Sequence, residues 1–246
     1  MKHTSNRPLP KKLMDHSVPF QIKEAFNALR TNIMYTAKES EGSPVYAVTS
    51  SEVGVGKSTI SANLALSFAQ AGKKVLLVDA DMRRPTQHGF FGYEEDNRGL
   101  SELLSHVEKK DDAVVRLARP NLYLLTSGCI PPNPSELMCS QSFKDYIKKW
   151  RGEYDIVFID LPPVSVVSDP LSLAALIDGY LFVAMLRKSN ANHINAALAN
   201  IESVQGRVIG TIVNGIQPKA RGYRYKKYSH DYYYYSPYKK KKKSEG

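Results

Sequence analysis

The segment Ser-Glu-Val-Gly-Val-Gly-Lys-Ser at residues 51–58 constrains the fold more than any other part of the chain. The apolar run at 45–50 predicts a buried strand before it, and the apolar segment 60–71 predicts a helix after it, closed by Gly72. A second apolar run at 75–79 predicts another strand. Strand, helix and strand within about 35 residues make a βαβ unit, which joins parallel strands. An α/β fold is therefore expected.

Four further apolar runs extend this pattern over most of the chain. They lie at 122–126, 156–160, 180–186 and 208–213, and helical segments separate them, one of which starts after Asn133. The runs are apolar throughout rather than alternating, which indicates strands that are covered on both faces. The sequence predicts a mostly parallel, doubly wound sheet with helices on both faces.

The glycine-rich segment has the composition of a phosphate-binding loop. Its two glycines let backbone N–H groups turn inward around phosphate oxygens, and the following helix adds the positive end of its dipole. In such a loop the lysine reaches the β- and γ-phosphates, and the next hydroxyl binds Mg²⁺. The fold class is therefore expected to be a P-loop NTPase. The predicted nucleotide-binding residues are Gly54, Val55, Gly56, Lys57, Ser58 and Thr59.

Three acidic residues stand at the carboxyl ends of predicted strands. Asp79 and Asp81 close the strand at 75–79, and Asp160 ends the strand at 156–160. In a parallel sheet these strand ends share one edge, where ligands bind. Carboxylates at this edge hold Mg²⁺ directly or through water. We therefore expect the three carboxylates and the Ser58 hydroxyl to surround the metal.

The positive charge of the chain is concentrated near its C-terminus. The net charge is +10, and residues 219–246 contain ten Lys/Arg against two acidic residues, so the remainder is close to neutral. This division predicts an extended N-terminal arm at 1–19, an α/β domain at 20–218 and a flexible tail at 219–246. Eight of the 15 tyrosines lie in the tail: Tyr223, Tyr225, Tyr228, Tyr232, Tyr233, Tyr234, Tyr235 and Tyr238.

Composition excludes several classes of protein. With 42% hydrophobic residues the chain can bury a full core, and no apolar run approaches the roughly 18 residues of a membrane span. Cys129 and Cys139 give neither a disulfide framework nor the spacing of a metal site. The first residues lack the apolar core of a signal peptide. A cytoplasmic protein is expected.

Residues 20–33 predict an amphipathic helix. Glu24, Asn27 and Arg30 form a polar stripe at three-residue spacing. The apolar residues recur at spacings of four, three and four, as on one face of a helix. They are Ile22, Phe26, Leu29 and Ile33.

The order of these features resembles the bacterial tyrosine kinases (BY-kinases), especially the cytoplasmic subunit of Gram-positive capsule and exopolysaccharide systems. The resemblance runs from about residue 20 to the end of the chain. It is carried by Asp-Ala-Asp-Met-Arg-Arg-Pro at 79–85, by Ile-Asp-Leu-Pro-Pro at 159–163 and by the tyrosine-rich tail. Two further stretches, at 24–33 and 127–137, also match.

The resemblance implies transfer of the γ-phosphate of ATP to a tyrosine hydroxyl, first in the chain's own tail. It implies that Lys57, Asp79, Asp81 and Asp160 are catalytic and that Asn214, at the end of the last strand, contacts the adenine. A phenol with a pKa of about 10 needs a base at neutral pH. We favour Asp79 as this base, although the sequence does not separate it from Asp81. Either Arg83 or Arg84 would join Lys57 in balancing the charge of the transferred group.

The resemblance also implies partners. A membrane-protein activator, related to regulators of polysaccharide chain length, would complete the nucleotide site with a cytoplasmic segment and recruit the chain to the inner face of the cell membrane. A cognate tyrosine phosphatase would reverse the reaction. Glu24 and Arg30 would support a ring-shaped homo-oligomer, in which tails are phosphorylated in trans, although Asn27 stands where the family has an arginine.

A partition- or positioning-type P-loop ATPase without protein kinase activity is the alternative. Such ATPases carry a lysine early in the loop, where this chain has Glu52. Interleaved Lys and Tyr in the tail could bind nucleic acid, but no nucleic-acid partner is expected. The glycine-rich loop and His-Arg-Asp segment of eukaryotic-type kinases do not occur.

Overall fold

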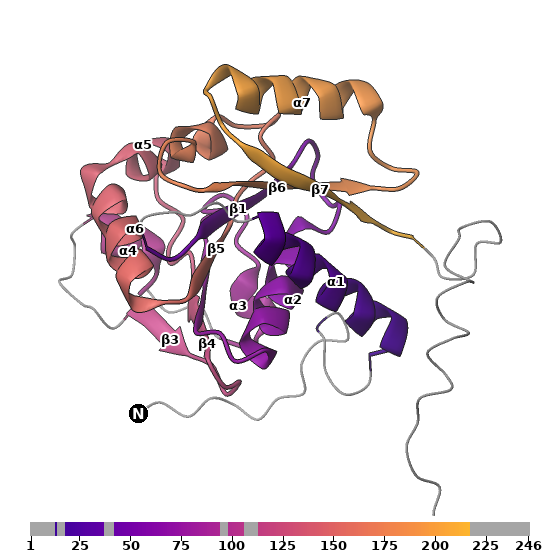
Figure 1. Ribbon diagram of the computed structural model, residues 1–246. Helices are drawn as coiled ribbons and strands as arrows, with labels where there is room; N and C mark the ends of the chain where they lie inside the picture. The colour runs from indigo at the N-terminus through magenta and orange to yellow at the C-terminus, as the bar shows by residue number, and fades with distance from the viewer. Residues whose placement is uncertain (1–12, 14–17, 37–41, 94–97, 106–112, 217–246) are drawn as a thin grey trace, which may run out of the picture. The chain divides into compact units, whose positions relative to one another are not determined.

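The computed structural model describes residue 13 and residues 18–36, 42–93, 98–105 and 113–216. Within them a seven-stranded sheet has the order β3-β4-β2-β5-β1-β6-β7 (Figure 1). The strands are β1 (Val45–Ser50), β2 (Val75–Asp79), β3 (Val114–Arg116), β4 (Leu122–Leu125), β5 (Ile156–Asp160), β6 (Gly179–Met185) and β7 (Val208–Asn214). The helices are α1 (Phe20–Thr36), α2 (Lys57–Gln70), α3 (Gln87–Phe90), α4 (Leu100–Ser105), α5 (Pro134–Cys139), α6 (Gln141–Glu153), α7 (Ala191–Ser203) and the 3₁₀ helix η2 (Asp169–Leu173).

The predicted sheet is confirmed, with one addition. All pairings among β4, β2, β5, β1, β6 and β7 are parallel. The sequence analysis missed β3, which pairs antiparallel with β4 at the edge of the sheet. Its three residues are too few to show a periodic pattern, and none of them is fully buried. The sequence around β3 therefore contains no apolar run long enough to indicate a strand.

Two cores, one on each face of the sheet, explain why the strands are apolar throughout. Val45 and Ala47 of β1 belong to the core beneath α4–α7, whereas Tyr46 and Val48 belong to the core beneath α1 and α2. Successive residues of a strand point to opposite faces, so both faces of β1 need apolar side chains. Figure 1 shows α1 and α2 beside each other, with α7 on the other side of the sheet.

Helix α1 is amphipathic, but its predicted apolar face is only partly buried. Phe26 and Ile33 pack into the core shared with α2, and Leu29 packs against its edge. Ile22, in the first turn of α1, is 41% exposed. The predicted helix is confirmed, and the later part of its apolar face is the part that packs into the core.

The two ends of the sequence lie largely outside the described residues. Of the arm expected at 1–19, Leu13 is buried in the core of α1 and α2, and Val18 packs against it. The tail at 219–246, with its eight tyrosines, lies outside the described part. Among the helices that are described, none is long and apolar enough to cross a membrane.

The strand order places the predicted site. Because β5 lies between β2 and β1, the phosphate loop that follows β1 is next to the end of β5. Asp79 and Asp160 are register partners on β2 and β5, so their Cα atoms lie opposite each other. The carboxyl ends of these parallel strands therefore bring the loop and the carboxylates to one edge, as the sequence predicts.

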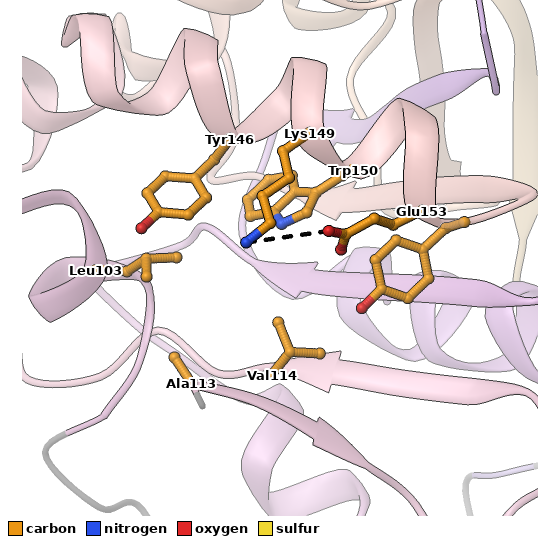
Figure 2. Close-up of a pocket in the computed structure, with 8 residues that line it drawn as sticks. Leu103, Ala113, Val114, Tyr146, Lys149, Trp150 and Glu153 are labelled. Carbon is orange, nitrogen blue, oxygen red and sulfur yellow. Dashed lines mark ion pairs between the residues drawn. The ribbon is translucent and has the colours of Figure 1, made fainter. Parts of the chain in front are cut away.

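A hollow beside α6 is separate from this edge. Figure 2 shows that α6 forms one wall, where Lys149 and Glu153 lie 4.0 Å apart. None of the predicted site residues lines it. The lining residues are Leu103, Ala113, Val114, Tyr146, Lys149, Trp150, Glu153 and Tyr154.

Candidate active site

The phosphate loop adopts a conformation that requires glycine. Gly54 and Gly56 have φ angles of 71° and 90°, in the left-handed region that L side chains rarely adopt. A Cβ atom at Gly56 would lie 2.3 Å from Nδ2 of Asn214. Lys57 follows as the first residue of α2, so the loop leads directly into the helix N-terminus. Backbone N–H groups and the helix dipole are thus available to an anion here.

Asn214 lies against this loop. Its side-chain amide donates to the carbonyl of Val55 at 2.9 Å, and its carbonyl oxygen accepts from the backbone N–H of Gly215 at 2.8 Å. Asn214 therefore supports the segment between the two glycines. Its predicted adenine contact stays a prediction.

Lys57 is held by two of the predicted carboxylates. Its Nζ lies 2.8 Å from Oδ1 of Asp160 and 3.6 Å from Oδ2 of Asp81, and it donates to Oγ of Ser58 at 3.2 Å. Burial opposes the charge of Lys57, but the attraction of Asp160 and Asp81 outweighs it and raises the pKa of the ammonium. The sequence therefore predicted a cluster that the fold assembles.

Asp160 is fully buried, and both of its carboxylate oxygens accept hydrogen bonds. Besides Lys57, Ser61 donates to its Oδ1 at 3.2 Å. Its Oδ2 accepts from the side-chain amide of Gln87 at 2.7 Å. Sequence reasoning missed Gln87. The available signal was a polar residue directly after the Asp-Met-Arg-Arg-Pro-Thr segment, at the start of a helix.

Asp79 faces the protein interior. Its Oδ2 accepts from the backbone N–H groups of Thr86 at 2.9 Å and Gln87 at 2.8 Å, so it fixes the start of α3. Burial, and then the charge of Asp160, raise the pKa of Asp79 to about 7, against the opposite effect of these hydrogen bonds. The side chain is fully inaccessible to solvent.

Asp81 lies nearer to the surface than Asp79. Its side chain is 11% exposed, and its Oδ1 accepts from the backbone N–H of Arg84 at 3.1 Å. Burial raises the pKa of this carboxyl, while Lys57 counteracts the rise. Of the two candidates for a base, Asp81 is therefore the one that an outside group can approach.

The two candidate arginines have different surroundings. Nε of Arg83 lies 2.9 Å from Oδ2 of the buried Asp169, and Arg83 also donates to Oγ of Ser135 at 3.2 Å. These bonds tie Arg83 to α5 and η2. Both arginines are exposed, the side chain of Arg83 to 42%, so the difference lies in the bonds that Arg83 already makes. Arg84 is therefore the better placed of the two to meet a ligand.

A contact that the sequence did not reveal holds the phosphate loop from outside. Glu52 accepts from the backbone N–H of Asn190 at 3.2 Å and lies 2.8 Å from Nδ1 of His193. Lys188 donates to the carbonyl of Gly54 at 2.8 Å. The hydrogen bond with His193 is the main reason why the pKa of Glu52 is lowered. The segment between β6 and α7 thus supports the loop.

The polar stripe of α1 makes bonds within the chain. Asn27 donates to Glu24 at 2.9 Å, and Arg30 donates to Asn27 at 3.0 Å. Arg30 also donates to the carbonyl and hydroxyl oxygens of Ser67 on α2, at 2.9 and 2.7 Å. Glu24 is exposed, whereas Arg30 links the two helices. Their role in assembly stays a prediction.

The donors at this edge suit Mg²⁺ bound together with phosphate. The described residues contain no group of three or more His, Cys, Asp or Glu side chains that could hold a metal ion by themselves. Mg²⁺ typically uses one or two carboxylates together with phosphate oxygens and waters. The Ser58 hydroxyl, Asp81 and Asp160 supply oxygen donors beside Lys57. Asp79 and Asp160 are equally buried, but Asp79 is bonded to the start of α3, whereas Asp160 is bonded to Lys57 at the end of the phosphate loop.

Gly56→Ala should weaken nucleotide binding because the new Cβ must displace Asn214 from the loop. We expect the affinity for Mg²⁺-ADP to fall by about tenfold or more, equivalent to roughly 1.4 kcal/mol. Gly72→Ala is a matched control, since Gly72 has a φ of 87° but nothing lies within 4 Å of its added Cβ. It should cost about 1 kcal/mol in unfolding free energy and leave the affinity unchanged. Equal affinities for the two variants would contradict the assignment of the loop.

The pKa of Asp79 predicts a pH-dependent stability in the absence of nucleotide and metal. Between about pH 4 and pH 7 the folded state keeps a proton at Asp79 that the unfolded state has lost, so folding stability falls as the pH rises. We expect denaturant titrations to show the unfolding free energy of the wild type falling relative to Asp79→Asn over this range. Asp145→Asn, on the exposed surface of α6, controls for charge removal. A wild-type unfolding free energy that stays constant or rises relative to that of Asp79→Asn between about pH 4 and pH 7 would refute the prediction.

Comparisons with known proteins agree with this geometry. The family described as an AAA domain matches residues 43–211. The chain is 38% identical over 192 residues to tyrosine-protein kinase YwqD of Bacillus subtilis, covering 78% of this chain and 80% of that protein. It is 34% identical over 203 residues to tyrosine-protein kinase CpsD of Streptococcus agalactiae, covering 82% and 87%.

A solved structure extends the agreement to the fold. The crystal structure of the chimerical protein CapA2B2 matches with a TM-score of 0.77 and 36% identity, covering 83% of this chain and 93% of that one. Sequence and fold thus agree over most of the chain. The chain belongs to the bacterial tyrosine-protein kinases and has their P-loop NTPase fold.

Proposed function

We propose that this chain is an ATP-dependent protein-tyrosine kinase that phosphorylates the tyrosine cluster of its own C-terminal tail. The observation that carries the proposal is the grouping of Lys57, Ser58, Asp81 and Asp160 beside a glycine-dependent loop. Phosphoryl transfer depends on positioning and charge stabilisation rather than on a special nucleophile of the enzyme. This edge of the sheet offers both.

We assign each residue of the site a role that follows from its surroundings. Bound Mg²⁺-ATP supplies the γ-phosphoryl group and the metal charge that offsets the phosphates. The backbone of residues 54–59 binds the phosphates, Lys57 donates to their oxygens, and Ser58 and Asp160 hold the metal, which leaves Asp81 free to accept a proton. Arg84 provides a further positive charge at the exposed edge, since Asp169 already engages Arg83.

Asp81 is the base in this proposal, in place of the expected Asp79. A tyrosine hydroxyl must lose its proton to attack phosphorus, and a base must lie within hydrogen-bond reach of it. Asp79 is fully buried and bonded to the start of α3, while part of Asp81 is exposed. The raised pKa of Asp81 also makes it a better proton acceptor than a free aspartate.

The path of the chain supports the tail as the first substrate. Asn214, the last residue of β7, touches Val55 of the phosphate loop, so the chain leaves the sheet beside the site. Tyr223 and Tyr238 follow Asn214 by 9 and 24 residues. At roughly 3.5 Å per residue they have a reach of about 30 to 85 Å, which includes a neighbouring subunit. Transfer in trans within a ring is therefore part of the proposal.

The same proposal includes regulation of capsular or exopolysaccharide synthesis. A membrane-protein activator supplies a cytoplasmic segment to the nucleotide site and brings the chain to the inner face of the membrane. A tyrosine phosphatase returns the tail to its basic state. Glu24, exposed on α1, is available for contacts between subunits, whereas Arg30 contributes by holding α1 on α2.

Labelled ATP tests the activity. In the presence of Mg²⁺ and the activator segment, we expect label on the wild type and at least about a hundredfold less on Lys57→Met, because the transferred charge is no longer balanced. Replacing all eight tail tyrosines by phenylalanine should abolish labelling of the chain. The exposed Lys73→Met and Tyr35→Phe are matched controls outside the site and the tail, and both should keep wild-type labelling.

Two outcomes would contradict the proposal. Label that remains on the protein without tail tyrosines would refute the tail as the acceptor. Release of phosphate without labelling of any protein, with activator present, would instead support the positioning-type ATPase.

A further inference from the structure

Gln87 joins three parts of the site from a fully buried position. It is the first residue of α3, and its side-chain amide donates to Oδ2 of Asp160 at 2.7 Å and to the carbonyl of Ser58 at 3.1 Å. Its backbone N–H donates to Oδ2 of Asp79 at 2.8 Å. One residue thus links the start of α2 with the ends of β2 and β5.

The orientation of the Gln87 amide is fixed by its partners. A carboxylate oxygen and a backbone carbonyl are both acceptors, so the nitrogen must face them. The amide oxygen, Oε1, then remains buried without a hydrogen-bond partner among the described residues. An unpaired buried polar atom costs about 1–3 kcal/mol, so the fold accepts an unpaired Oε1 in order to keep the two hydrogen bonds that the amide nitrogen donates. The two donated hydrogen bonds therefore point to a role in the site.

An amide suits this place better than a charged side chain. Asp160 and Asp79 are both buried, and Lys57 already occupies Oδ1 of Asp160. A cationic side chain at Oδ2 would compete with Mg²⁺ for the Asp160 carboxylate. An anionic side chain would repel that carboxylate. A neutral donor can keep the carboxylate oriented without adding charge. Donors of this kind around a metal ligand fix its direction and tune its affinity.

We propose that Gln87 is a positioning residue, which holds the carboxylate of Asp160 and the backbone of Ser58 in the orientation that binds Mg²⁺ together with nucleotide. The proposal rests on the nucleotide site described above. A positioning role differs from a purely structural one in a measurable way. Loss of the Gln87 amide must weaken nucleotide binding in the presence of Mg²⁺ more than nucleotide binding without metal.

Titration of the full-length chain with a fluorescent ADP analogue, in Mg²⁺ and in EDTA, tests this difference. Gln87→Met keeps the volume of the side chain but removes the donor. We expect it to reduce the enhancement of ADP affinity by Mg²⁺ about 10- to 100-fold, as for partners of other metal ligands, while affinity in EDTA changes less than about twofold. Gln141→Met is the matched control, because Gln141 is exposed and bonded to Asp145 on α6, and it should behave as the wild type.

Each result has a definite meaning. A wild-type enhancement in Gln87→Met, or an equal loss of affinity with and without Mg²⁺, would overturn the positioning role. If the wild type itself binds no ADP in Mg²⁺, the proposed function fails instead. Should circular dichroism show Gln87→Met to be unfolded, Gln87→Asn takes its place, since it retracts the same amide by one methylene and should show the same selective loss.

Discussion

The candidate site depends on the interactions that compensate the buried charge of the Asp160 carboxylate. A buried charge is tolerated only when it is paired and hydrogen-bonded. Asp160 meets this condition through Lys57 and Ser61 on one oxygen and Gln87 on the other. These donors come from the helix after the phosphate loop and from α3. The need to compensate a single charge therefore fixes the loop, two helices and the central strand relative to one another.

The three aspartates show how surroundings separate identical side chains. All three occur at the ends of neighbouring strands, yet Asp160 meets a cation, Asp79 meets two backbone N–H groups and Asp81 approaches the surface. Burial raises the pKa of both Asp79 and Asp81. Environments that differ in this way are how one residue type comes to play several roles in a catalytic site.

Much of the fold could be predicted from the sequence because its signals are local. Runs such as 45–50 and 156–160 are apolar on both faces, and the glycines of the loop need positive φ angles. The same reasoning could not find contacts between distant segments. Glu52 meets His193 after 141 residues of chain, and only the folded β6–α7 segment brings them together.

Other misses have equally specific reasons. Three residues, two half-buried and one exposed, were too few to reveal β3, and a helical period could not show that Ile22 is exposed. Gln87 reads as an ordinary polar residue until the tertiary structure buries it beside Asp160. The sequence correctly predicted that Asp79 lies at the carboxyl edge of the sheet. It could not predict the direction of the side chain, which turns toward the start of α3.

The burial of α2 makes this helix a rigid connection between α1 and the site. Lys57 stands at its first residue, and Ser67, ten residues later and about 15 Å along the axis, receives Arg30 of α1. Eleven of the 14 residues of α2 are buried, so close-packed neighbours leave it little room to bend. The helix is held near its start by the ion pair of Lys57 with Asp160 and near its end by the hydrogen bonds of Arg30 to Ser67. The bonds of Arg30 to Ser67 therefore connect α1, through one closely packed helix, with the residue that carries the ammonium group of the site.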